Sequence, residues 1–85
     1  MRITSASQLV AGRRYRVVLH VGTGVQGITV EGERVRVEVA EGTVLEYKNS
    51  LEAGYCLFKL RTGNFAGDMA EIHRVWIEGN LEEEE

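Results

Sequence analysis

The chain has 85 residues, of which 44% are hydrophobic and 27% charged, and its formal net charge is −3. This length holds one domain, and the composition is that of a folded globular protein, which excludes the intrinsically disordered class. No apolar run approaches the about 20 residues of a membrane-spanning helix, and the N-terminus has no secretion-signal pattern. The single cysteine excludes an internal disulfide framework. We therefore expect a soluble, cytoplasmic protein that binds no membrane.

The first predicted element is a short helix. Ser5 and Gln8 have the spacing of a capping box, in which the serine side chain accepts a backbone hydrogen bond and the glutamine side chain reaches back. Gly12 is placed to end the helix in a left-handed conformation. We expect one or two helical turns between residues 6 and 11.

A glycine-rich segment follows the first predicted strand. Gly22, Gly24 and Gly27 have the G-x-G-x-x-G spacing of nucleotide-binding loops, which requires a helix whose N-terminus receives the phosphates. Residues 28–31 instead alternate with a period of two, so no helix starts there. We interpret residues 21–27 as a mobile hairpin loop whose glycines accept positive φ and which orders on contact with a partner.

Six strands are predicted from alternating apolar residues and from glycine turns at intervals of about 8 to 12 residues. The clearest is the second arm of a hairpin, where three valines alternate with Arg34, Arg36 and Glu38. The predicted ranges are 14–21 (with Tyr15, Val17, Leu19 and Val21 on one face), 28–31, 34–39, 44–48, 55–61 (with Cys56, Phe58 and Leu60 on one face) and 72–78.

The order of these elements favours an all-β fold. Asp68 and Glu71 have the D-x-x-E spacing of a helix start, which predicts one helical turn before the last strand. Five or six short strands with such a turn resemble the layout of SH3-like barrels. We expect a small five- to six-stranded antiparallel SH3-like or OB-like barrel or sheet with a short N-terminal helix, or alternatively an open β-sandwich.

The C-terminus is strongly acidic. Glu82 to Glu85 are four of the 13 acidic residues, which leaves nine carboxylates against ten lysines and arginines in the rest of the chain. We predict a single β-barrel domain over residues 1–80 and a disordered, solvated tail over residues 81–85. The alternative is an acidic segment that docks on a basic partner.

The residues that carry metal or nucleophile chemistry are few and dispersed. His20, Cys56 and His73 lack the paired spacing of metal ligands. Cys56 with His73 and Asp68 is the one nucleophile–base–acid set, and nothing in its spacing favours catalysis. We predict that Cys56 is a core residue, and we expect no catalytic residues, metal or cofactor and no enzymatic activity.

An apolar and aromatic surface is the strongest indication of function. Tyr55 and Leu57 lie opposite the apolar face of their strand, and Trp76 takes the corresponding face of the last strand, beside basic residues. Protein interfaces are enriched in aromatic residues and arginine. Alternatively, the N-terminal helix or the loop of residues 62–68 covers this surface. The predicted partner-binding residues are Tyr55, Leu57, Lys59, Arg61, Phe65, Arg74 and Trp76.

We therefore predict a non-enzymatic protein-binding module. It would act as an adaptor, an assembly subunit or an inhibitor that occupies a partner's surface, a class that includes phage and mobile-element inhibitors of host activities. Self-association through edge strands or the Tyr55 and Trp76 face is a further expectation. The alternative is a small-barrel nucleic-acid-binding protein, although glutamates are interspersed among its basic residues. Its predicted contacts are Arg14, Arg16, Arg34 and Arg36, with Lys59 and Arg61.

Overall fold

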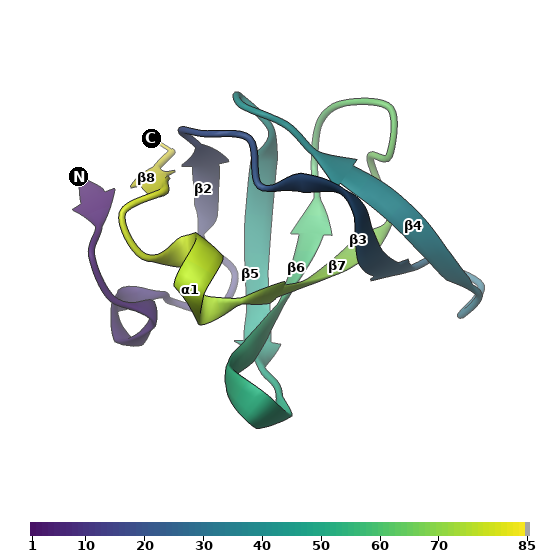
Figure 1. Ribbon diagram of the computed structural model, residues 1–85, viewed down its shortest axis with the longest axis horizontal. Helices are drawn as coiled ribbons and strands as arrows, with labels where there is room; N and C mark the ends of the chain where they lie inside the picture. Colours follow the sequence, from purple (N-terminus) through teal and green to yellow (C-terminus); the bar gives the residue numbers. More distant parts are fainter. Residues whose placement is uncertain (85) are drawn as a thin grey trace.

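The computed structural model describes residues 1–84, which form one antiparallel sheet of eight strands in the order β1-β8-β2-β5-β6-β7-β3-β4 (Figure 1). In chain order the elements are β1 (Arg2–Ile3), a 3₁₀ helix (Ala6–Gln8), β2 (Arg14–Val17), β3 (Gly22–Ile28), β4 (Arg34–Val39), β5 (Val44–Ser50), a 3₁₀ turn (Glu52–Gly54), β6 (Tyr55–Leu60), β7 (Met69–His73), α1 (Arg74–Ile77) and β8 (Leu81–Glu83).

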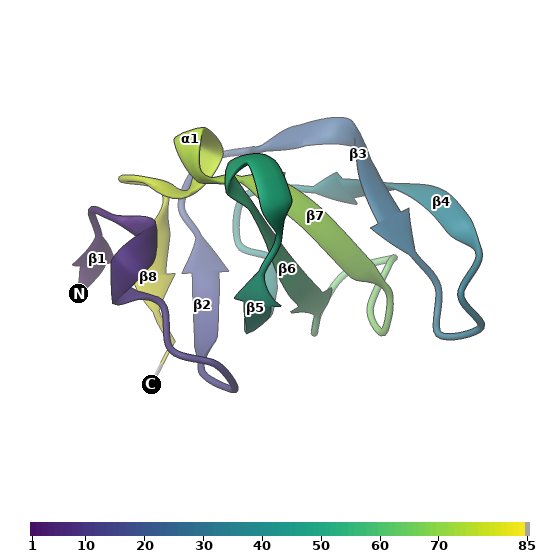
Figure 2. The same ribbon diagram turned by 90° about the horizontal axis from the view of Figure 1, so that it is seen from below.

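The predicted all-β class, antiparallel sheet and short N-terminal helix are confirmed, but the sheet has eight strands instead of five or six and does not close into a barrel. β1 and β4 are the two edges of the sheet, and within residues 1–84 they do not pair with each other. Figure 2 shows the strands fanned across the molecule from β1 on one side to β4 on the other. The two- and three-residue strands β1 and β8 are too short to produce an alternating pattern in the sequence.

One hydrophobic core covers the inner face of the sheet. The predicted inner face of β6 is confirmed, because Cys56, Phe58 and Leu60 are all buried. Leu19 was predicted to share a strand face with Tyr15 and Val17 but is 64% exposed, since β2 ends at Val17. The largest side chains with almost no exposure are Tyr15, Phe58, Ile3, Leu45, Leu60, Ile77 and Leu81.

The N-terminal capping box is confirmed. Ser5 Oγ accepts a hydrogen bond from Ser7 N at 3.3 Å, and Gln8 Oε1 accepts one from Ser5 N at 3.1 Å. The helix is shorter than predicted, because Leu9 already has an extended backbone and packs onto the core. No helix among residues 1–84 is both long enough and apolar enough to cross a membrane.

The glycine-rich segment is a strand and not a loop. Residues 22–28 form β3, which pairs with β4 and carries a register shift between Gly22 and Val25. The hairpin turn lies at residues 29–33, where Thr29 N donates to Glu33 O at 2.8 Å. Glycines have no side chains to alternate between two faces, so this segment lacks the alternating pattern that predicts a strand.

Position 27 has no room for a side chain, because β3 packs closely against β7 and β4 there. A Cβ atom there would lie 2.6 Å from the Met69 carbonyl oxygen and 3.0 Å from Val37 Cγ1. We expect Gly27→Ala to lower the free energy of unfolding by about 1–3 kcal/mol, because one of these groups must move. Urea unfolding followed by circular dichroism measures this. Gln26→Ala on the same strand is the control and should change stability by less than about 0.5 kcal/mol; equal effects would contradict the close contact.

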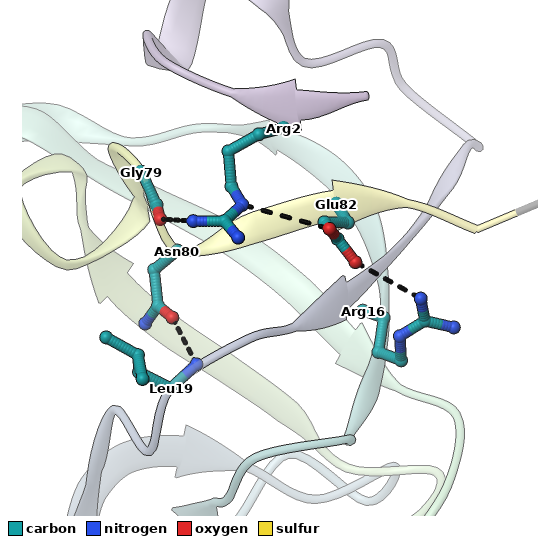
Figure 3. Close-up of polar contacts among 6 residues, drawn as sticks. All are labelled: Arg2, Arg16, Leu19, Gly79, Asn80 and Glu82. Carbon is teal, nitrogen blue, oxygen red and sulfur yellow. Dashed lines mark hydrogen bonds and ion pairs between the residues drawn. The ribbon is translucent and has the colours of Figure 1, made fainter.

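The acidic C-terminal segment is ordered through residue 84, which corrects the predicted disordered tail. β8 lies between β1 and β2, and Leu81 is 1% exposed. Arg16 Nη2 is 3.2 Å from Glu82 Oε2, and Arg2 Nε is 3.9 Å from Glu82 Oε1 (Figure 3). The basic partner of this segment is therefore the chain's own N-terminal part. Glu85 lies outside the described residues.

Asn80, which directly precedes β8, forms hydrogen bonds with the residues that follow β2. It is a buried polar residue whose side-chain oxygen accepts a hydrogen bond from Leu19 N (Figure 3). Its backbone oxygen accepts a second bond, from Val18 N at 2.8 Å. These bonds hold the backbone of Val18 and Leu19 beside Asn80, directly after the end of β2 at Val17.

A helical turn was predicted at residues 68–71 and a strand at residues 72–78, but the structure has these two elements in the opposite order. Residues 69–73 form β7, and residues 74–77 form the single turn of α1. His73 Nδ1 accepts a hydrogen bond from Val75 N at 3.2 Å, so its side chain caps this turn. Trp76 consequently projects from a helix and not from a strand.

Candidate functional site

An open groove of ≈ 470 Å³ lies where β3 and β7 separate. In Figure 1 the two strands converge at the Met69 end of β7 and diverge toward α1. We call this depression the β3–β7 groove. It is lined by Val21, Gly22, Thr23, Gly24, Val25 and Gln26 on one side, by Glu71, Ile72 and His73 on the other, and by Arg36, Tyr55 and Trp76.

The groove is a gap in the hydrogen-bonded ladder of the sheet. β3 and β7 are paired only at Gly27 with Ala70 and at Ile28 with Met69. The same register would next place Gln26 opposite Glu71, but these residues are not paired. β7 meanwhile continues along β6 as far as the pair of Tyr55 with His73. Beyond Gly27, β3 therefore follows β4 and leaves one edge of β7 uncovered.

Two exposed aromatic residues flank the groove. Tyr55 is 42% exposed and Trp76 is 56% exposed. Tyr55 meets His73 edge to face, with ring centroids 5.0 Å apart. Because His73 also caps α1, it links the turn that carries Trp76 to the strand that carries Tyr55. The predicted association of Tyr55 with Trp76 at one surface agrees with this arrangement, although the predicted strand position of Trp76 does not.

Arg36 stands on the opposite side of the groove. Its Nη1 donates to Gly24 O at 2.8 Å, so the guanidinium is held against the glycine-rich segment. Arg36 belongs to the predicted alternative nucleic-acid set, and the structure brings it to the groove that Tyr55 and Trp76 line. Sequence reasoning missed Glu71 and His73 as groove residues, because the β7 strand itself was not predicted.

The other predicted partner-binding residues lie outside the groove. Leu57 and Lys59 are half-buried on the outer face of β6, opposite Glu71 and Met69 respectively. Phe65 is partly buried and packs against the core, so it anchors its loop inward. The remaining two are exposed: Arg61 lies just after β6, and Arg74 lines a smaller depression of ≈ 330 Å³ on another side of Tyr55.

Several residues of the alternative nucleic-acid set are engaged with carboxylates. Arg16 lies 3.2 Å from Glu82 and 3.3 Å from Glu84. Arg14 is paired in the ladder with Glu46. A hydrogen bond from Lys48 holds the pKa of Glu46 below its ordinary value of 4.5, and the positive charges of Lys48, Arg61 and Arg14 act in the same direction. This part of the outer face is therefore largely neutralised.

The candidate nucleophile and base do not converge. Cys56 points into the core, and burial raises the pKa of its thiol. His73 lies on the opposite, outer face of the sheet, and Asp68 is beyond the far end of β7. Among residues 1–84, no three histidine, cysteine or acidic side chains are grouped so that they could hold a metal ion.

Comparisons with protein-family models, with curated proteins and with solved structures find no match to this chain. Its function is therefore inferred from the groove and its surroundings.

Proposed function

We propose that the chain is a non-enzymatic protein-binding module that contacts its partner through the β3–β7 groove. The observation that carries this proposal is the exposure of Tyr55 and Trp76 beside the groove, at 42% and 56%. Tryptophan, tyrosine and arginine are the residues most enriched at the energetic centres of protein interfaces, and Arg36 completes this set.

The apolar lining of the groove supports the same proposal. Val21, Val25 and Ile72 supply apolar surface between the polar walls. A small apolar centre surrounded by polar groups is the common anatomy of a protein interface. Such a module would serve in the cytoplasm as an adaptor, an assembly subunit or an inhibitor, since each of these roles requires only that it occupies a partner's surface.

Nucleic acid is the second candidate ligand. The observation that favours it is a row of residues with two basic side chains on the outer face of the sheet. The ladders place Arg34, Ile28, Met69 and Lys59 in one row across β4, β3, β7 and β6. Arg34 and Lys59 form no ion pair with any other residue of the described chain. If this face bound nucleic acid, changing Arg34 and Arg36 together to alanine would abolish binding, and affinity would fall steeply with salt.

The test of the proposed function is affinity capture from the native lysate, with and without nuclease, using the wild type and two variants. Trp76→Ala removes the aromatic side chain of the groove. Val75→Ala is the matched control, because Val75 is 64% exposed on the same helical turn but does not line the groove. We expect Trp76→Ala to weaken binding of the captured protein by about 2 kcal/mol, or about 30-fold in Kd, and Val75→Ala to have little effect.

Two results would contradict the proposal. One is a captured protein that all three baits retain equally, since Trp76 would then lie outside the interface. The other is enrichment that disappears on nuclease treatment, which would favour the nucleic-acid alternative.

A further inference from the structure

We propose that the partner supplies an extended segment that pairs with the uncovered edge of β7 inside the β3–β7 groove and so adds a strand to the sheet. This inference rests on the proposed function and specifies how the partner is recognised. In strand addition, main-chain hydrogen bonds provide affinity and alternate side chains provide specificity.

The backbone of Glu71 and the N–H of His73 present the hydrogen-bonding groups for such a strand. Leu60 N donates to Asp68 O at 2.8 Å, which marks these residues as a hydrogen-bonded pair. In an antiparallel ladder such pairs alternate, so Ala70 and Ile72 bond to β6 while Glu71 and His73 direct their backbone groups to the other side. No residue of β3 is paired with His73 on that side. The N–H of His73 and the N–H and C=O of Glu71 therefore face the groove, whereas the C=O of His73, the N-cap of α1, accepts the first hydrogen bond of that helix.

The groove has the volume of a short strand segment. Strands lie about 4.8 Å apart and rise about 3.3 Å per residue, and packed layers are about 10 Å thick, so one strand residue occupies ~160 Å³. The ≈ 470 Å³ of the groove therefore holds about three residues. This matches the stretch of Glu71 to His73 that lies beyond the last pair with β3.

The walls specify the side chains of the segment. Side chains that point inward would meet Val21, Val25 and Ile72 and should be apolar. A side chain that points outward opposite Glu71 should be basic, because opposite charges directly across two strands attract and Glu71 forms no ion pair within residues 1–84. The fitting partner is an extended segment that alternates apolar and polar residues, with lysine or arginine facing Glu71.

A substitution at His73 can remove the edge donor alone. The φ of His73 is −71°, close to the about −65° that proline imposes, and its N–H is not used by β6. His73→Pro therefore deletes the N–H that faces the groove. His73→Ala is the matched control, since both variants lose the imidazole ring and the cap of α1 but the alanine variant keeps the N–H. Thermal unfolding monitors whether both remain folded.

The probe is a random heptapeptide library displayed on phage and selected on the full immobilised chain. We expect the selected peptides to alternate apolar and polar residues and to contain lysine or arginine. Isothermal titration of the best peptide, made synthetically, should show about tenfold weaker binding to His73→Pro than to His73→Ala, the effect of one lost hydrogen bond. Glu71→Gln should also weaken binding of the basic peptide.

A second measurement leaves the protein unchanged. N-methylation of the peptide at residues whose N–H groups face β7 should abolish binding, whereas N-methylation at the intervening residues should be tolerated. A library that yields no peptide, equal affinities for His73→Pro and His73→Ala, or tolerance of every N-methyl group would each overturn strand addition. If the Trp76→Ala variant fails to capture the partner protein from the lysate, the proposed function stands even where strand addition is overturned. If this variant captures the partner as well as the wild type does, the proposed function itself is wrong.

Discussion

Phe58→Ala is expected to lower the free energy of unfolding by about 3–5 kcal/mol, because it opens a cavity in the centre of the sheet. Phe58 is 0% exposed on β6, which lies between β5 and β7, and its ring centroid is 5.6 Å from that of Tyr47. A domain of this size has a stability of about 4–13 kcal/mol, so this one change removes a large part of it.

Urea unfolding at equilibrium, followed by circular dichroism, measures this loss. Leu57→Ala is the control, since Leu57 is the neighbouring residue and lies half-buried on the outer face of the same strand. We expect it to cost about 1 kcal/mol. Similar losses for the two variants would contradict the assignment of the inner and outer faces of β6, and with it the outward position of Tyr55.

Ending the chain after Asn80 is expected to lower the free energy of unfolding by at least about 3 kcal/mol. The truncation removes β8, which pairs with both β1 and β2, and with it the fully buried side chain of Leu81. Burial of one leucine contributes about 1.5–3 kcal/mol, and the loss of ladder hydrogen bonds adds to this. The exposed ion pairs of Glu82 contribute less, because each is worth at most about 1 kcal/mol.

Thermal and urea unfolding of two truncated chains tests this. A chain that ends after Glu83 keeps β8 and should lose about 1 kcal/mol, from the backbone bond that Glu84 N donates to Arg14 O and from the exposed pair of Arg16 with Glu84. If the chain that ends after Asn80 is as stable as this control, the C-terminal residues are dispensable, as their acidic composition alone suggests.

Local patterns in the sequence predicted the elements whose side chains alternate regularly. The second arm of the hairpin was predicted at residues 34–39, which are the bounds of β4, and the buried face of β6 was predicted correctly. The capping box was also predicted, because its two residues are neighbours in the chain. In these cases the physical cause of the structure lies within a few residues.

The elements that were missed depend on distant partners or on side chains that are absent. β8 is ordered by residues of β1 and β2, at the opposite end of the chain, so its glutamates alone favoured a solvated tail. β3 is rich in glycine and showed no alternation. The alternation of Val75 and Ile77 predicted a strand, but the side-chain cap from His73 starts a helical turn instead.

Part of the candidate site was predicted from the sequence, and the part that depends on distant strands was not. Tyr55 and Trp76 were predicted as partner-binding residues from the strand faces they were assigned to and from the enrichment of aromatic residues and arginine at protein interfaces. Their association with Arg36 and the glycine-rich segment follows from the strand order, which places β3 beside β7 although they are distant in the chain. The gap between these strands is a property of the pairing register and has no local signal in the sequence.

The most direct test of the proposed binding site uses the single tryptophan of the chain. Biosynthetic labelling with 5-fluorotryptophan places one fluorine nucleus at Trp76, beside the β3–β7 groove, and gives one ¹⁹F resonance. We predict that this resonance shifts or broadens when the captured partner protein is added to saturation, because Trp76 becomes buried in the interface. A resonance that stays unchanged at saturation would contradict the assignment of the groove as the protein-binding site.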